Sequence, residues 1–478
     1  MQKMSGVFNN ERTIVILLIV ASFYIVGSSY ADLSEPHLWR KADAYSQILG
    51  WAGFKDFVPF QNFMGKTVVY DIPVYEYLIA KLSALTFSDL LVTTKYLNLF
   101  FFLVVALTGY SISEALCREA GIYYLFLLCT SRFFLYYYAA PLPDDMSLAL
   151  SMAGLAILLK SRNLKFIVLA GALWLVAALI KSPIPFIFVV FFSSRLLLQH
   201  MRGTALSSYA WAVIPISLAL VGAIAAERAR MLIMSRNVGG FAQDPSFYFG
   251  TLDQRLSLEF WTTMGHRAFS ANRALAACVP GLIYLTFRGS FRTVLPFAVA
   301  FLSGWLVFAP LYLQSDYYQL PGTSLLFIVA AMGAQISAEF LMKKIDAGDT
   351  SAWKLRRARN LVLAVLAPLV VIYMPKLGEF HSTSFSKSVT YALRDVDHVM
   401  FVDDQHLATD PAIGAQIATK FTRIPPSAFE EHCESLIAAN RAILVNGHSA
   451  CLSRHKDSAS IFIEDDGKQF YLRPKDKS

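Results

Sequence analysis

The ionisable side chains of this sequence gather beside its apolar segments, where a charged group is costly and usually has a function. Arg40 and Asp43 share one helical face in the segment that follows the first apolar stretch. Asp144, Asp145 and Lys181 stand where later apolar stretches begin or end. A carboxylate can take a proton from a hydroxyl group, and a cationic side chain can bind an anion, so these positions predict a site that handles both.

Each of these residues also has an ordinary structural role. Arg40 and Asp43 could form a solvated ion pair, which contributes little to stability. Asp144 and Asp145 could favour the start of a helix through its macrodipole. Lys181 could extend its ammonium group to the membrane surface. Residue type and spacing alone leave these structural roles open beside the chemical ones.

Two further groups of polar residues precede apolar stretches. The segment around 37–51 and a second segment that begins at Asp71 predict two helices that lie on the membrane surface. Asp71 can cap the second helix, which has Pro73 in its first turn, and capping is its simplest role. Asp316, Tyr317 and Tyr318 stand just before a late apolar stretch, where tyrosines are common at the boundary between lipid and water. Asp71 is therefore a candidate for binding a ligand or for capping a helix. Asp316, Tyr317 and Tyr318 are candidates for binding a ligand or for anchoring the chain at the membrane boundary.

The segment 227–271 is unusually basic for a loop outside the membrane. Charge bias during membrane insertion does not explain these groups, although long loops escape that bias. An anionic phosphate ligand is one physical reason for them, and anionic lipid headgroups are the non-catalytic alternative. The basic residues in and just beyond this segment are Arg228, Arg230, Arg236, Arg255, His266, Arg267 and Arg273.

Composition identifies the class of protein that must position these residues. Of the 478 residues, 56% are hydrophobic and 16% are charged, with a mean hydropathy of +0.48. A soluble domain carries about 25% charged residues, so a soluble enzyme and a disordered chain are both excluded. The net charge of +8 could suggest nucleic acid, but no soluble basic domain carries it. The composition predicts a polytopic α-helical membrane protein.

A membrane span requires about 20 mostly apolar residues, and the sequence contains eleven candidates. The first has no small-residue cleavage site after it, so we expect a retained helix and not a signal peptide. The candidates are 13–30, 91–113, 121–139, 144–160, 164–180, 183–199, 208–226, 272–287, 291–312, 322–341 and 359–374.

The distribution of Lys and Arg predicts the orientation. With the N-terminus in the cytoplasm, sixteen basic residues fall on the inner side, while the short outer loops contribute only Lys181. The longer outer segments are 31–90, 227–271 and 375–478. This orientation places the C-terminal segment outside the cytoplasm, beside the same face of the membrane as the candidate site. The sixteen are Lys3, Arg12, Arg118, Lys160, Arg162, Lys165, Arg195, Arg202, Arg288, Arg292, Lys343, Lys344, Lys354, Arg356, Arg357 and Arg359.

The composition changes after residue 374, which divides the chain into a membrane domain (1–374) and a small soluble domain (375–478). Short β-like runs at 398–402, 442–445 and 460–463, with a helical pattern at 426–440, predict an α/β domain. Its two cysteines, Cys433 and Cys451, could pair in an oxidising compartment or remain free thiols.

Five short motifs occur in the order found in one family of membrane enzymes. The chain resembles the bacterial protein O-mannosyltransferase-like branch of the GT-C glycosyltransferases, to which the aminoarabinose transferases of lipid A belong. The resemblance covers roughly residues 10–340. It departs from the family where Asp316 replaces a common His, and where Asp43 lacks an adjacent acidic partner. The matching stretches are Trp39-Arg-Lys-Ala-Asp43, Asp71-Ile-Pro-Val-Tyr75-Glu-Tyr-Leu, Pro143-Asp144, Ile180-Lys181-Ser-Pro183 and Asp316-Tyr-Tyr-Gln-Leu-Pro321.

The resemblance implies an inverting glycosyltransferase of the bacterial inner membrane. It would move a sugar from a polyprenyl-phosphate carrier to a lipid, glycan or protein acceptor at the periplasmic face, and we expect no cofactor. The residues themselves require no metal, although a carboxylate–metal arrangement is an alternative. Asp43 would be the catalytic base, while Lys181, Arg40 and Arg267 would bind the donor phosphate. The other residues expected at the substrate are Asp71, Tyr75, Asp144, Asp145, Asp316, Tyr317 and Tyr318.

Two other classes of protein compete with a glycosyltransferase. A transporter or flippase for a lipid-linked saccharide would show repeated halves and ionisable groups near the middle of the membrane. The sequence has no clear repeat, and its charges lie at one face, with Arg132 as the main exception. A non-catalytic scaffold would not require the ordered motifs.

Overall fold

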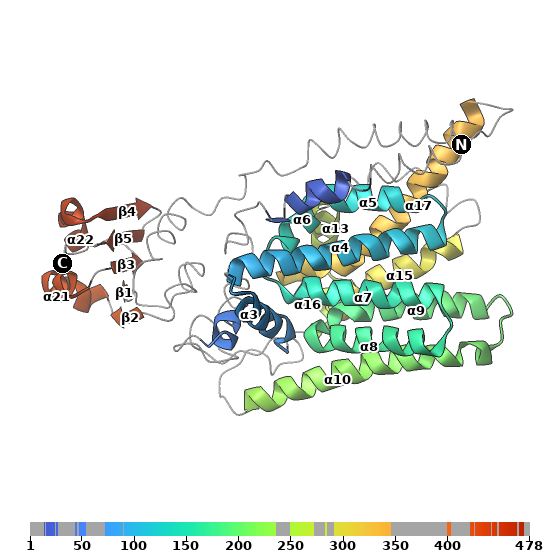
Figure 1. Cartoon of the computed structure of the whole chain (residues 1–478), viewed down its shortest axis with the longest axis horizontal. Helices are drawn as coiled ribbons and strands as arrows, with labels where there is room; N and C mark the ends of the chain where they lie inside the picture. The colour runs from blue at the N-terminus through green and yellow to red at the C-terminus, as the bar shows by residue number, and fades with distance from the viewer. Residues whose placement is uncertain are drawn as a thin grey trace. The chain divides into compact units, whose positions relative to one another are not determined.

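The computed structural model shows a bundle of long helices and a small mixed sheet (Figure 1). The chain divides into two compact units. One unit comprises Met1–Ser28, Tyr70–Ile72 and Lys95–Pro375, and the other comprises Ser29–Val69, Pro73–Thr94 and Lys376–Ser478. The structure describes residues 14, 16–23, 25–26, 44, 47–53, 72–88, 90–235, 249–271, 283, 291–345, 399–402, 421–424, 426–440, 442–446, 449–465 and 468–472.

The helical bundle is built from apolar segments joined by short turns. Helix α7 packs against α8, α8 against α10, and α9 against α15, while α17 packs against α5. A three-residue turn joins α7 to α8, and Asn163 caps α8 by accepting a hydrogen bond from the backbone N–H of Lys165 (3.0 Å). The main helices are α4 (Leu90–Leu116), α5 (Gly121–Thr130), α6 (Arg132–Tyr138), α7 (Pro143–Lys160), α8 (Leu164–Lys181), α9 (Pro183–His200), α10 (Val213–Ser235), α15 (Phe291–Val307) and α17 (Leu320–Ile345).

Two of the predicted single spans are interrupted. The segment 121–139 forms α5 and α6, separated by Ser131, whose backbone is extended and whose hydroxyl accepts a hydrogen bond from Phe134 N (3.4 Å). The segment 291–312 breaks at Phe308 into α15 and the short α16 (Ala309–Gln314). Hydropathy averages over both breaks because the residues on each side are apolar. The prediction of one continuous helix was wrong at both places.

Five of the described helices are long and apolar enough to cross a membrane. They correspond to predicted spans, with bounds that differ by a few residues, and support a multi-pass membrane protein. Helical backbone at 16–23 agrees with the first predicted span, whereas 272–287 (apart from Ile283) and 359–374 lie outside the described residues. The total of eleven spans therefore stays a prediction. The five helices are Val92–Leu116, Leu164–Lys181, Pro183–His200, Ser207–Leu232 and Tyr317–Phe340.

The second unit contains the predicted surface helix α3 (Val74–Thr86). Pro73 occupies the position before its first turn, so Pro73 and not Asp71 stands at the N-cap. In the same unit, Gln47–Trp51 is helical, and the Trp51 indole lies edge-on to the Tyr77 ring at 5.2 Å. Helical backbone around 47–51 agrees with the predicted first surface helix, most of which lies outside the described residues.

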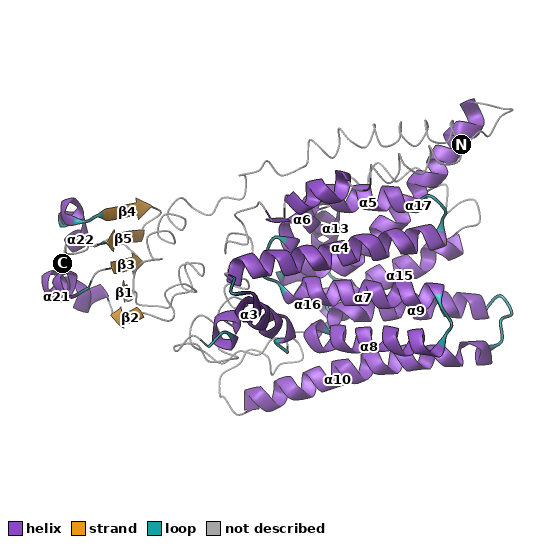
Figure 2. Ribbon diagram, in the orientation of Figure 1, coloured by secondary structure: helices purple, strands orange, loops and turns teal. Residues whose placement is uncertain are grey.

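The C-terminal part of the second unit is a five-stranded sheet in the order β2-β1-β3-β5-β4 (Figure 2). Strand β1 is parallel to β2 and β3, while β5 is antiparallel to β3 and β4. The three predicted strands and the predicted helix are present, and β2 and β5 are additional. The elements are β1 (Val399–Val402), β2 (Phe421–Ile424), α21 (Pro426–Ala439), β3 (Ala442–Asn446), α22 (Ala450–Arg454), β4 (Ile461–Asp465) and β5 (Lys468–Leu472).

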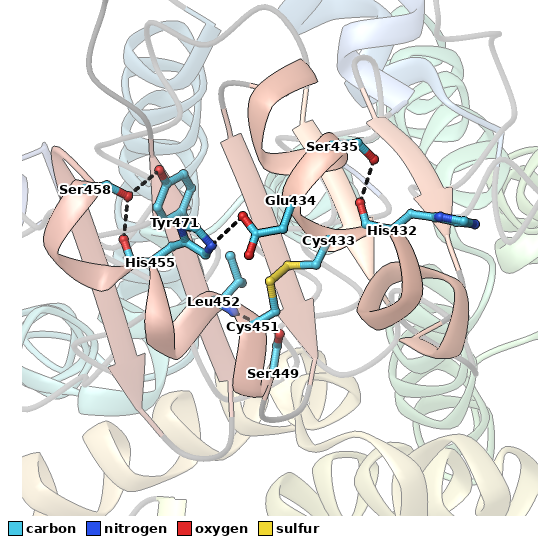
Figure 3. Close-up of polar contacts among 10 residues, drawn as sticks. All are labelled: His432, Cys433, Glu434, Ser435, Ser449, Cys451, Leu452, His455, Ser458 and Tyr471. Atoms are coloured by element: carbon cyan, nitrogen blue, oxygen red, sulfur yellow. Dashed lines mark hydrogen bonds and ion pairs between the residues drawn. A yellow bond between two sulfur atoms is a disulfide. The ribbon is translucent and has the colours of Figure 1, made fainter.

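A disulfide joins α21 to α22 on one side of this sheet (Figure 3). Cys433 and Cys451 are buried in the core of the sheet domain, with Cα atoms 6.4 Å apart. The pairing decides between the two alternatives that the sequence left open. The disulfide is typical of a protein segment that folds in an oxidising compartment.

Replacing both cysteines, Cys433→Ser with Cys451→Ser, is expected to destabilise the sheet domain by about 3 kcal/mol, because the closed loop restricts the unfolded chain. The two residues are 18 positions apart, which sets the length of that loop. Hydrogen exchange of β1 and β3 in the full chain measures the loss. Cys117→Ser, which removes a free thiol, is the control. Equal protection in the double variant and the control would contradict a stabilising disulfide.

Beside the disulfide lies the one group of described residues whose spacing suits a metal ion. Glu434, Cys451 and His455 place their potential ligand atoms within 4.8 Å of one another. The Cys451 sulfur is bonded to Cys433, so it has no thiolate to offer. The remaining two side chains form an ion pair, with Nε2 of His455 2.8 Å from a Glu434 oxygen (Figure 3). This cluster is consequently a structural contact between α21 and α22.

Candidate active site

Two adjacent carboxylates are completely buried at the start of α7. Leu142 is extended, Pro143 begins the helix, and Asp144 and Asp145 follow in its first turn. The preceding turn is held by Asn98 of α4, whose Nδ2 donates to the carbonyl oxygen of Ala140 at 2.6 Å. The favourable macrodipole at a helix N-terminus partly offsets the cost of burying acidic groups there.

Asp145 is not a helix cap. Its two carboxylate oxygens are shielded from solvent and have no hydrogen-bond partner among the residues that the structure describes. Asp145 also interacts electrostatically with Asp144, and two like charges so close repel one another. A buried carboxylate without a partner is costly to the fold, which favours a role in binding a ligand over a role in stability.

Lys181 is the last residue of α8, and its side chain is buried. Ser147 of α7 joins the two helices here, because its hydroxyl donates to the carbonyl oxygens of Ala177 (2.9 Å) and Lys181 (3.4 Å). The start of α7 therefore lies beside the end of α8. Acidic residues of α7 and a basic residue of α8 lie at the same end of the bundle, and the substrate-binding roles of Asp144, Asp145 and Lys181 stay predictions.

The Lys181 ammonium group lies over two tyrosine rings. Its nitrogen is 5.1 Å from the ring centroid of Tyr318 and 5.9 Å from that of Tyr317. Both tyrosines belong to the short helix η6 (Asp316–Gln319), and their ring centroids are 4.7 Å apart. They are buried, so the simple interpretation as lipid-facing belt residues was wrong for this pair. The motif before α17 instead places aromatic faces against the cation of α8.

Three further polar or aromatic side chains at this end did not appear among the sequence-based candidates. Tyr137 of α6 lies edge-on to Tyr317 at 6.1 Å. Tyr138 interacts electrostatically with Asp145, and its hydroxyl is buried with no hydrogen-bond partner among the described residues. The Gln319 amide is likewise buried without a described partner. The three-tyrosine run at 136–138 and the position of Gln319 inside its motif were available signals.

The arrangement combines one cation, two carboxylates and several buried hydroxyl and amide groups. A protonated amine and tyrosine hydroxyls can stabilise negative charge on a phosphate oxygen. Carboxylate and amide groups can hydrogen-bond the hydroxyl groups of a sugar. The described geometry is therefore suited to a ligand that carries both a phosphate and several hydroxyl groups.

Several predicted site residues cannot be placed with this group. Arg40, Asp43 and Asp71 lie outside the described residues. The backbones of Asp316, in η6, and Arg267, in α13 (Leu258–Ala271), are described, but their side chains are not. Tyr75 is buried in α3, in the other compact unit. The roles predicted for these six residues stay predictions.

Two of the described arginines of the 227–271 segment, Arg230 and Arg255, make contacts within the protein. The Arg255 guanidinium donates to four backbone carbonyl oxygens, including Thr251 O at 2.9 Å and Leu306 O, and so ties α12 (Leu252–Leu256) to the end of α15. Arg230 pairs with Glu227 one turn earlier in α10. These contacts explain why both residues are basic without a phosphate ligand. A phosphate was one explanation for the basic segment as a whole.

No protein-family model matches the chain, and no curated protein matches its sequence. Solved structures do match. The structure of ArnT from Cupriavidus metallidurans bound to undecaprenyl phosphate superposes with a TM-score of 0.63 at 10% identity, covering 96% of this chain and 97% of ArnT. The chain has a GT-C fold. The shared fold agrees with the fold that the ordered motifs implied.

Two other enzymes with the GT-C fold match with lower coverage of their own length. The Archaeoglobus fulgidus oligosaccharyltransferase tethered with an acceptor peptide has a TM-score of 0.53 at 11% identity, over 91% of this chain and 69% of the enzyme. The mycobacterial arabinofuranosyltransferase AftD has a TM-score of 0.50 at 12% identity, over 98% of this chain and 40% of AftD. The likeness therefore extends to an oligosaccharyltransferase and an arabinofuranosyltransferase.

Proposed function

We propose that this protein is an inverting glycosyltransferase that takes a sugar from a polyprenyl-phosphate carrier. The observation that carries the proposal is the buried Lys181 ammonium over Tyr317 and Tyr318, beside the buried carboxylates of Asp144 and Asp145. The GT-C fold supports it, because ArnT with this fold is bound to undecaprenyl phosphate. The acceptor is a lipid, a glycan or a protein, and the reaction takes place at the periplasmic face of the bacterial inner membrane.

The reaction requires a base, a sugar site and a stabiliser of the leaving group. Asp43 takes the proton of the acceptor hydroxyl, and the oxygen attacks the anomeric carbon from the side opposite the phosphate. The bond between that carbon and the phosphate oxygen breaks, and polyprenyl phosphate leaves with the electron pair. Lys181, helped by Arg40 and Arg267, stabilises the charge that develops on this phosphate.

The remaining groups hold the sugar and complete the phosphate site. Tyr317 and Tyr318 bind the phosphate through their hydroxyl groups or the sugar through their ring faces. Asp144 and Asp145 accept hydrogen bonds from sugar hydroxyls. The sugar thereby gives the Asp145 oxygens the hydrogen-bond partners that they lack among the described residues. For Asp71, Tyr75 and Asp316, contact with the substrate is what the motifs of the resembling family imply.

A transfer assay separates this function from transport. Purified full-length protein in lipid nanodiscs is given a polyprenyl-phosphate sugar that is radiolabelled in the sugar, together with candidate lipid, glycan and peptide acceptors. We expect the label to move to one acceptor and an equal amount of polyprenyl phosphate to form. A flippase would instead move the intact donor across a sealed vesicle and leave its glycosidic bond unbroken. That second result would overturn the proposed function.

A further inference from the structure

Three arginines gather at the end of the bundle opposite the candidate active site. Arg162 lies in the turn between α7 and α8, Arg195 is in the last turns of α9, and Arg202 follows the end of that helix (Figure 1). Arg195 interacts electrostatically with both Arg162 and Arg202, so three like charges repel one another within a small area. Such a cluster is unfavourable unless negative charge balances it.

The protein itself supplies no balancing charge from this part of the chain. The sequence contains no Asp or Glu between Asp145 and Glu227, a stretch that includes all three arginines. Among the described residues, no carboxylate forms an ion pair with Arg162, Arg195 or Arg202. No described residue therefore balances these charges, and an anion from outside the chain can do so.

An aromatic side chain fixes the position of one arginine of the cluster, Arg162. The Arg162 guanidinium lies over the Trp211 ring, 4.0 Å from its centroid, in a cation–π contact. Trp211 makes two further contacts. Its ring lies edge-on to Phe192 of α9 at 5.6 Å, and its Nε1 donates a hydrogen bond to the carbonyl oxygen of Ser208 at 3.0 Å. These contacts fix Arg162 relative to α9 and to the start of α10, so the charge has a defined position.

A hydroxyl group completes the polar surroundings. The Tyr209 hydroxyl is shielded from solvent, has no hydrogen-bond partner among the described residues, and interacts electrostatically with Arg162. The turn that carries Arg202 is fixed by a contact of 2.8 Å between His200 Nδ1 and the carbonyl oxygen of Thr204. An anionic oxygen beside these residues could accept hydrogen bonds from both the guanidinium groups and the Tyr209 hydroxyl.

Exposed apolar side chains surround the arginines. Leu164, Leu197, Met201 and Val213 stand at the same ends of α8, α9 and α10, and each exposes more than half of its surface. In a multi-pass membrane protein such side chains contact lipid acyl chains. A ligand that is anionic at one end and apolar along its length matches both parts of this surface.

We propose that Arg162, Arg195 and Arg202, with Trp211 and Tyr209, bind the phosphate headgroup of an anionic phospholipid. The acyl chains of that lipid lie along the exposed apolar ends of α8, α9 and α10. Positively charged loops attract anionic lipids in a diffuse way. This cluster differs because its arginines come from separate segments and because the Arg162 guanidinium is held against the Trp211 ring. The site is independent of the proposed transfer reaction.

Lipid binding to the purified chain tests the site. The full-length protein is delipidated in neutral detergent, titrated with phosphatidylglycerol or phosphatidylcholine, and examined by native mass spectrometry. We expect one tightly bound phosphatidylglycerol and no matching binding of phosphatidylcholine. Each lost arginine is expected to weaken binding about fivefold, so Arg162→Gln with Arg195→Gln should weaken it roughly 25-fold.

The matched control removes two other basic residues, Arg118 and Arg292, as Arg118→Gln with Arg292→Gln. Binding of phosphatidylglycerol close to that of the unchanged protein in this control supports a defined site. Equal loss in both double variants, or no loss in the first, would overturn the proposal in favour of diffuse charge attraction. Displacement of the lipid by millimolar inorganic phosphate would also overturn it, because the site would then recognise phosphate without the lipid. Circular dichroism of each variant verifies that the helices remain folded.

Discussion

Lys181→Gln is expected to weaken the binding of polyprenyl phosphate by about tenfold to a hundredfold. The ammonium group is buried against Tyr317 and Tyr318, so little water screens its attraction for a phosphate. A hydrogen bond that involves a charged group contributes about 1.5–3 kcal/mol, which corresponds to this range of affinity. Glutamine keeps much of the length and hydrogen-bonding capacity of the side chain but removes the charge.

The effect of Lys181→Gln should be specific to the donor. Equilibrium binding of a fluorescent polyprenyl phosphate to the full-length protein measures it, and the transfer assay shows whether turnover falls by at least the same factor. Lys165→Gln, at the exposed opposite end of α8, is the matched control and should bind the donor normally. Unchanged donor affinity in Lys181→Gln would remove Lys181 from the phosphate site. Lys181 would then be a packing residue at the end of α8, held by its contacts with Tyr317 and Tyr318.

The sequence predicted most of the helical bundle because apolar length is a strong and local signal. The bounds of α8 and α9 differ from the predicted spans by a single residue, since charged or proline residues stand at their ends. The breaks at Ser131 and Phe308 were not predicted, because both lie inside continuous apolar sequence. Ser131 carries a usable signal, since a serine three residues before Phe134 can begin a new helix, but serine is also common inside membrane helices.

The sheet domain shows the limits of local patterns in a different way. β1 and β3 are short, apolar and recognisable, whereas β2 (Phe-Thr-Arg-Ile) has too weak an alternation to stand out. Its place in the sheet depends on parallel pairing with β1, a contact between residues about twenty positions apart. Such pairing is a property of the folded chain and leaves little trace in a four-residue window.

The residues of the candidate site also differ in how easily the sequence reveals them. Asp144, Asp145 and Lys181 could be singled out as candidates because charge is rare beside apolar sequence. Tyr137, Tyr138 and Gln319 were missed because uncharged side chains are common in membrane helices, and only the fold brings them to the charged group. Arg255 has a structural role that the sequence does not reveal. Its charge suggested a phosphate, but its guanidinium donates to the protein backbone.

Asp43→Asn is expected to reduce the rate of transfer by roughly 10²- to 10⁴-fold, the usual contribution of a general base. The prediction rests on the Trp-Arg-x-Ala-Asp motif, since Asp43 lies outside the described residues. Asparagine has nearly the same shape as aspartate but cannot accept the proton of the acceptor hydroxyl. Donor binding should therefore stay within about twofold of the unchanged protein, because the phosphate and the sugar are held by other groups.

The division between rate and binding is what distinguishes Asp43 from the other acidic residues. Single-turnover transfer from a preloaded donor gives the chemical rate, and equilibrium binding of the polyprenyl phosphate gives the affinity. Asp144→Asn, in contrast, should change the discrimination between donor sugars, because that carboxylate is expected to hold sugar hydroxyls. Asp253→Asn, an exposed residue of α12, is the control and should leave both quantities unchanged. A normal chemical rate in Asp43→Asn would assign the proton transfer to another carboxylate. Asp145 would then be the next residue to mutate, because its carboxylate is buried without a described hydrogen-bond partner.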